Sequence, residues 1–158
     1  MKFYVKRLMP ILLILSSATA VIAQTREPIV IARNSNQSNI ENIVSGEIFS
    51  EFSLPSILGK TKDIQGNDCL GFVGDQPNYL LNLESGFNEL NLVISSNGDT
   101  TMAVEAPGGS LYCGDDTTAS NQDASLNLTN LPSGEYKVWI GAFDEGNDLN
   151  YSLEINAN

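Results

Sequence analysis

The stretch that decides the fold is LNLVISSNGDTTMAVEAPGGSLYC, residues 90–113. Apolar side chains recur there at every second position in three runs: Leu90, Leu92, Ile94; Met102, Val104, Ala106; Leu111, Cys113. This period of two is typical of a strand with one buried face. Asn97-Gly98 predicts a hairpin turn after the first run, and Pro107-Gly108-Gly109 ends the second. The stretch therefore predicts three short strands joined by tight turns.

The same pattern extends on both sides of this stretch. Further strands are predicted, by alternating apolar residues, at 48–54, 79–83, 124–128, 136–142 and 149–155. No run after the N-terminal segment keeps apolar residues at helical spacing over three turns. We therefore expect residues 46–158 to form an all-β domain with essentially no helix, a two-layer antiparallel β-sandwich of about eight strands, jelly-roll-like. A closed barrel would bury the same strand faces and stays open as an alternative.

The composition excludes several classes of function. The chain has 158 residues, with 8 Lys plus Arg, 19 Asp plus Glu and no His, for a formal net charge of -11. Without His there can be no Ser-His-Asp or Cys-His catalysis and no His-ligated zinc. The acidic balance argues against binding to a phosphate backbone, so we expect no nucleic-acid partner.

The first 23 residues resemble a targeting segment. Lys2, Lys6 and Arg7 form a positive head, Ile11–Leu15 begins an apolar stretch, and Val21-Ile22-Ala23 suits a cleavage site. An uncleaved membrane anchor is the alternative, but the apolar run is shorter than the ~20 residues that a membrane span prefers. We therefore expect a secreted or periplasmic protein, cleaved near Ala23, with no membrane span after cleavage.

Residues 24–45 are rich in Asn and Ser and are expected to be a linker. Their one apolar patch, Ile29-Val30-Ile31, predicts an edge strand. The two cysteines, Cys69 and Cys113, both follow the linker. Because an exported chain meets an oxidising compartment, we expect them to form a disulfide. A reactive thiol is the alternative, but the chain has no His to activate it and no C-x-x-C motif.

A family resemblance covers about half of the chain, residues 78–156. Its motifs are Tyr79-x-Leu81-x-Leu83, Gly98-Asp99, Ala106-Pro107-Gly108-Gly109, Cys113-Gly114-Asp115-Asp116, Pro132-Ser133-Gly134-Glu135-Tyr136-Lys137-Val138-Trp139 and Tyr151-Ser152-Leu153-Glu154-Ile155. In this order they resemble the bacterial pre-peptidase C-terminal (PPC) domain. The resemblance implies a small β-sandwich of the kind appended to secreted proteases and other exported enzymes. Here the leader is followed by this domain and a linker too short for a catalytic domain, so the chain resembles a free-standing version.

Adjacent carboxylates suggest a metal site. Asp115 and Asp116 lie together in a predicted turn, where they repel each other and a cation would relieve the repulsion. The family resemblance adds Asp99 to this pair as a third candidate ligand for Ca²⁺, and the sequence suggests no other cofactor. The alternative is that these are solvated turn acids, as the acids of other predicted turns, Asp123, Asp144 and Glu145, would be.

Aromatic residues suggest a second type of binding surface. Strict alternation puts Trp139 on the strand face opposite the core, and Phe143 and Tyr112 could share that side. Exposed aromatic side chains on a sheet can stack on sugars or bind a partner. The alternative is that a loop, the linker or a strand covers them.

From these features we expect a non-catalytic binding or accessory module that docks on a polymer or an exported protein. Two alternatives remain open. The first is a small carboxylate-based hydrolase, either a glycosidase or a protease, whose acids would have to share one cleft. The second is a structural or assembly protein of the cell surface that pairs through an edge strand.

Overall fold

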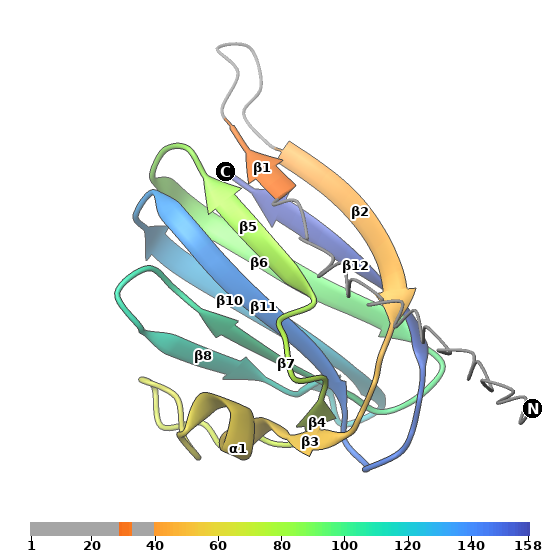
Figure 1. Cartoon of the computed structure of the whole chain (residues 1–158). Helices are drawn as coiled ribbons and strands as arrows, with labels where there is room; N and C mark the ends of the chain where they lie inside the picture. The colour runs from red at the N-terminus through yellow and green to blue at the C-terminus, as the bar shows by residue number, and fades with distance from the viewer. Residues whose placement is uncertain (1–28, 33–39) are drawn as a thin grey trace, which may run out of the picture.

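The computed structural model describes residues 29–32 and 40–158, so the predicted leader lies outside the described residues. Its strands form two layers, as the sequence predicts (Figure 1). The first sheet contains β1 (Ile29–Ile31), β3 (Phe52–Ser53), β4 (Phe72–Val73), β5 (Tyr79–Leu83), β7 (Thr100–Glu105), β8 (Leu111–Gly114) and β11 (Gly134–Ala142). The second contains β2 (Ile40–Glu47), β6 (Phe87–Ser96), β9 (Asp116–Thr118), β10 (Asn121–Leu131) and β12 (Asn150–Ala157).

Strand β11 organises the first sheet. It pairs antiparallel with β5 on one side and with β7 on the other, and β7 pairs in turn with β8. Strand β1 adds to the outside of β5 in parallel, and β4 meets the end of β11 at Ala142. The second sheet is antiparallel throughout, in the order β2-β12-β6-β10-β9. The fold is therefore an all-β sandwich, as expected, with twelve described strands rather than about eight.

The main core lies between the two sheets. The alternating residues of the quoted stretch supply much of it, since Leu90, Leu92 and Ile94 of β6 face Met102 and Val104 of β7 within one cluster of buried side chains. All five side chains are at most 1% exposed. Burying apolar side chains of this size contributes on the order of 1.5–3 kcal/mol each, so this layer is the main source of stability.

A second, smaller core covers the outer face of the first sheet. A five-residue helix, α1 (Leu54–Leu58), lies against this face (Figure 1). The buried members of the cluster are Leu54, Cys69, Val73, Ala103, Leu111, Cys113 and Trp139. The cluster forms because β7, β8 and β11 alternate, so their residues that point away from the main core need a cover of their own.

The helix replaces part of a predicted strand. The alternation over 48–54 predicted one strand, but only Phe52 and Ser53 pair, and the chain becomes helical at Leu54. Pro55 lies at the start of the helix, where its missing N–H costs nothing, and Gly59 ends it with a φ of 66°. These are ordinary helix start and stop signals, and the strand prediction overlooked them.

The segment before residue 46 is also more regular than predicted. The expected edge strand is present as β1, but β2 begins at Ile40, inside the predicted linker, and pairs with β12 along its whole length. The described part of the predicted linker therefore contributes one strand to each sheet. None of the described residues belongs to a helix with the length and hydropathy needed to cross a bilayer.

The turn at Asn97-Gly98 is not a hairpin. Strand β6 before it belongs to the second sheet and β7 after it to the first, so the chain crosses from one layer to the other here. Gly98 packs closely against Leu149, because a Cβ at this position would lie 2.8 Å from both terminal methyl carbons of Leu149. The crossing brings Asp99, the next residue, to the end of the sandwich where the acidic cluster forms.

Candidate metal centre

Three aspartates come from two separate connections between strands. Asp99 precedes the first residue of β7, whereas Asp115 and Asp116 lie at the junction of β8 and β9. Strands β7 and β8 form a hairpin in which Met102 pairs with Gly114, so the start of β7 and the end of β8 meet at one end of the sheet. The two connections are therefore neighbours in space although they are distant in sequence.

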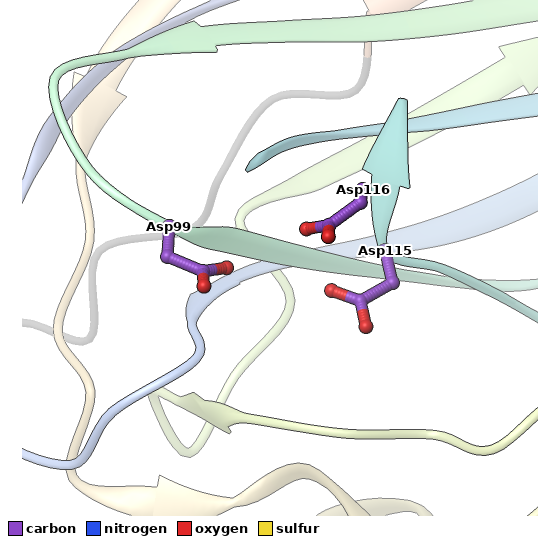
Figure 2. A group of neighbouring side chains, drawn as sticks. All are labelled: Asp99, Asp115 and Asp116. Carbon is purple, nitrogen blue, oxygen red and sulfur yellow. The ribbon is translucent and has the colours of Figure 1, made fainter. Parts of the chain in front are cut away.

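The three carboxylates face one another. One oxygen from each of Asp99, Asp115 and Asp116 lies within 4.8 Å of the others. Figure 2 shows the side chains turned toward a common point from the two connections. Asp99 and Asp115 are partly buried, whereas Asp116 is exposed. The structure thus brings together all three of the residues that were predicted as calcium ligands.

Hydrogen bonds compensate only part of the negative charge of the three carboxylates. The side-chain Nε2 of Gln122 donates to Oδ2 of Asp99 at 2.9 Å. The other oxygen of Asp99 and Oδ1 of Asp115 are buried and have no hydrogen-bond donor among the described residues. Oxygen atoms that are buried without a donor are costly, so this cluster lacks positive charge.

The pKa values of Asp99 and Asp115 also indicate that the cluster lacks a compensating positive charge. Burial raises the pKa of Asp99 above its ordinary value, and the charges of Asp116, Asp115 and Asp144 raise it further. Burial also raises the pKa of Asp115, with Asp116 adding repulsion, while a hydrogen bond from the backbone N–H of Asp116 lowers it in part. A hard cation in the middle would remove the repulsion and accept the free oxygens as ligands.

The other acids of the predicted turns have different surroundings. Asp123 accepts a hydrogen bond from the backbone N–H of Ser96 at 2.9 Å, which ties β10 to β6. Asp144 is close enough to raise the pKa of Asp99 but is exposed, and Glu145 beside it is exposed as well. Only the set of Asp99, Asp115 and Asp116 is grouped closely enough, within the described chain, to hold a metal ion.

The expected disulfide is present. Cys69 and Cys113 are joined with an S–S distance of 2.05 Å and a Cα–Cα distance of 5.2 Å. Both residues are buried in the second core. The bond therefore ties the irregular segment after α1 to strand β8, just before Gly114 and the acidic pair.

The predicted aromatic surface does not form. Trp139 does lie on the face opposite the main core, but it is only 6% exposed because α1 and the neighbouring segment cover it. Tyr112 packs against the main core, since it lies one residue from Cys113 and alternation turns it inward. Phe143 follows the end of β11 and is 42% exposed. The three side chains are thus divided between a buried cluster, the main core and the surface.

Asp63 has a structural role that the sequence analysis missed. Its carboxylate accepts hydrogen bonds from the backbone N–H groups of Gln65, Asn67 and Cys113 and from the side chain of Asn67, at 2.8–3.2 Å. Burial alone would raise the pKa of Asp63, but these four donors outweigh it and lower the pKa. The signal for this turn is Asp63 followed by Gly66, a spacing typical of a type I turn.

Surface hollows lie away from the acidic cluster. A shallow one of about 940 Å³ adjoins β2, β12 and the end of β6 and is lined by Ser45, Gly46, Glu47, Ser95, Ser96, Asn97, Asn150 and Tyr151. Another of about 620 Å³ lies beside α1, between Ile57 and Trp139. The three aspartates line neither of these two hollows. The acidic cluster is therefore a compact group of carboxylates that is separate from both.

Comparisons with known proteins show similarity of structure only. No family model matches the sequence, and no curated protein matches it. The structure is similar to the pre-peptidase C-terminal domain of collagenase from Bacillus anthracis, with 14% identity, 85% of this chain and 99% of that chain covered, and a TM-score of 0.48. It is also similar to PliG of Aeromonas hydrophila, a periplasmic inhibitor of g-type lysozyme, with 10% identity, coverage of 84% and 98%, and a TM-score of 0.44.

Proposed function

We propose that this protein is a non-catalytic, exported binding or accessory module whose fold is stabilised by a calcium ion. The ion is held by Asp99, Asp115 and Asp116. The observation that carries the proposal is the convergence of these three carboxylates within 4.8 Å, with two buried oxygens that have no donor in the described part of the chain. The binding role rests on the resemblance to PPC domains that the sequence motifs carry.

Calcium suits this site better than softer metals. The three side chains offer only oxygen, which hard cations prefer, and the chain has no His to favour zinc or copper. Ca²⁺ accepts six to eight oxygen ligands in flexible geometry, so water completes the shell on the exposed side of Asp116. Because the ion would link the start of β7 to the end of β8, it stabilises the end of the sandwich.

The same geometry speaks against a hydrolase. A carboxylate that activates water or protonates a leaving group must reach the substrate. Oδ1 of Asp99 and Oδ1 of Asp115 are both buried. Burial and mutual repulsion account for the raised pKa values of Asp99 and Asp115 without a catalytic role.

Calcium titration with thermal melting tests the stabilising ion. We expect the melting temperature in millimolar Ca²⁺ to exceed that in EDTA by about 10 °C if the ion is present at 100 times its Kd. Asp116→Asn should remove most of this difference. Asp148→Asn, an exposed acid outside the cluster, is the matched control and should respond as the wild type does. Equal melting of the wild type with and without Ca²⁺ would remove calcium from the proposal.

A separate experiment tests the binding role. The purified protein, immobilised in Ca²⁺, is incubated with insoluble polysaccharides, fibrous proteins and co-exported enzymes, and bound material is quantified against a blank resin. Saturable binding to one of these classes supports the module. Turnover of polysaccharide or protein substrates that Asp99→Asn abolishes would instead establish the hydrolase.

A further inference from the structure

Strand β2 is an unusually long open edge in this fold. The other edge strands of the described sheets, β1, β3, β8 and β9, have two to four residues each. Strand β2 has eight, and only β12 pairs with it among the described strands (Figure 1). One side of its backbone therefore offers a row of N–H and C=O groups for a further strand.

Several of the usual protections of an edge strand are missing from β2. Residues 40–47 contain no Pro and no Lys, the residues that most often prevent pairing at an edge. The register with β12 runs without a bulge from Glu47 opposite Asn150 to Ile40 opposite Ala157. One carbonyl, that of Ser45, accepts a hydrogen bond from the hydroxyl of Tyr79 at 3.3 Å, so the edge is anchored to the first sheet while no described strand covers it.

The outward side chains of β2 determine which kind of guest strand could pair with this edge. Glu41, Ile43, Ser45 and Glu47 alternate along the exposed face. Ile43 is 64% exposed, the highest value among the large apolar side chains that the structure describes. The edge thus presents one apolar side chain between two acidic ends.

The charged residues that the structure describes on this side are all acidic. The three basic residues of the described chain are Lys60, Lys62 and Lys137, and all lie outside the second sheet. Glu154 of β12, directly opposite Ile43, adds a third acid to the same face. A guest strand that carries positive charge would therefore meet complementary charge at both ends and beside the apolar position.

We infer that the β2 edge binds an extended, basic segment of another protein, which adds to the second sheet as an antiparallel strand. Main-chain hydrogen bonds to β2 provide the pairing, and alternate side chains provide the specificity. The guest carries Lys or Arg opposite Glu41 and Glu47 and an aliphatic side chain opposite Ile43. This inference deepens the proposed binding role and rests on it, but it does not depend on calcium.

A second copy of the chain is the less suitable occupant. Antiparallel self-pairing centred on Ile43 would place Glu41 opposite Ser45 of the other copy and leave no positive charge near either glutamate. Two chains with a formal net charge of -11 each would also repel one another, most strongly at low salt.

The test uses a labelled peptide, Lys-Val-Thr-Ala-Ile-Val-Lys, with blocked ends and fluorescence anisotropy as the readout. We expect saturable binding that weakens with salt, because two charge pairs contribute. Ile43→Lys should weaken binding at least tenfold. Ile64→Lys is the matched control, since Ile64 is 59% exposed, lies outside the sheets and receives the same charge. A peptide with Glu in place of both Lys residues should not bind.

Amide exchange locates the peptide on the chain. Slower exchange confined to residues 40–47 supports strand addition, whereas slower exchange elsewhere, or equal binding by the Ile43→Lys and Ile64→Lys variants, overturns it. Sedimentation tests self-pairing. If the wild type is a dimer that Ile43→Lys disrupts and that the peptide does not displace, the edge binds a second copy of the chain, and the inference of a basic guest strand is overturned. If the peptide fails to bind while the polymer and partner assays still find a ligand, the edge inference fails and the proposed function stands.

Discussion

Asp63 on the one hand, and Asp99 and Asp115 on the other, show how surroundings decide what a carboxylate does. Asp63 accepts four hydrogen bonds, and its lowered pKa marks a charge that the local chain stabilises. Asp99 and Asp115 each keep one buried oxygen without a donor within residues 40–158, and their pKa values are raised. The first is therefore a fixed part of a turn, whereas the other two are suited to an exchangeable cation.

The raised pKa values predict a specific pH dependence in EDTA. Between the ordinary value of 3.8 and the raised folded-state pKa, the folded protein binds more protons than the unfolded chain, so the free energy of unfolding falls as the pH rises through this range. We expect the melting temperature of the wild type in EDTA to fall as the pH rises from 3.8 through the raised pKa values of Asp99 and Asp115. Asp116→Asn should reduce this fall by removing repulsion from both partners, and Asp148→Asn should preserve it. The same pH dependence in the wild type and in Asp116→Asn would contradict the assignment.

Replacing Asp63 should destabilise the protein without affecting calcium. Asp63→Ala leaves the N–H groups of Gln65, Asn67 and Cys113 without their acceptor, which we expect to cost about 2–3 kcal/mol. Urea unfolding in saturating Ca²⁺ measures this cost. Asp68→Ala is the control, because its ion pair with Lys62 is exposed and contributes about 0–1 kcal/mol. Equal stability of the two variants would show that the Asp63 hydrogen bonds contribute little.

At the scale of elements, the alternation of apolar residues was the most reliable signal. It predicted β5, β6, β7, β10, β11 and β12, because each has one face in the main core. It could not show which strands pair, so Asn97-Gly98 was wrongly predicted as a hairpin although it joins the two sheets. The acidic cluster was predicted from its turns and the family resemblance, but the burial of its oxygens depends on packing that no local pattern encodes.

Two glycines at strand connections allow a prediction about packing. A Cβ on Gly114 would collide with the backbone carbonyl of Ser125 and approach Cγ of Leu126 to 2.7 Å, whereas the atoms nearest to a Cβ on Gly98 belong to the end of the Leu149 side chain, which can shift more easily than backbone. We expect Gly114→Ala to cost about 2–3 kcal/mol and Gly98→Ala less than about 1 kcal/mol. Urea denaturation ranks the two variants. The reverse order would mean that β8 and β10 separate more easily than Leu149 can move.

The disulfide supports a different element, the segment that covers the outer face of the first sheet. Cys69 and Cys113 are 44 residues apart, for which a chain-entropy model gives about 4 kcal/mol of stabilisation. We expect the Cys69→Ser/Cys113→Ser double variant to lose up to this amount in urea unfolding. Amide exchange should accelerate in residues 54–70 more than in β6 and β12. Uniform acceleration across both regions would show that the bond stabilises the whole sandwich equally.

At the scale of the whole molecule, the first sheet has a core on each of its faces. Strand β11 belongs to both, since Val138 and Ile140 point into the main core and Trp139 between them into the second. The two cores consequently share a backbone, and with the disulfide intact they should unfold as one cooperative unit.

The single tryptophan can test this cooperativity. Trp139 reports on the second core, and far-ultraviolet circular dichroism reports on both sheets. We expect the two melting curves to coincide in the oxidised protein. After reduction, the Trp139 transition should move to a lower temperature than the dichroism transition, because the covering segment loses its covalent link. Coincident curves in both states would indicate that noncovalent packing alone couples the cores.

The tyrosine pair between the sheets offers an optical reporter for the open edge. Tyr151 on β12 donates from its hydroxyl to that of Tyr79 on β5 at 3.0 Å, and Tyr79 donates to the carbonyl of Ser45 on β2. A strand that competes for this carbonyl would alter the hydrogen bonding of both phenols, and phenol absorbance near 280 nm senses such changes. Ultraviolet difference spectroscopy could thus follow occupancy of β2 in unlabelled protein, using the molecule's own chromophores.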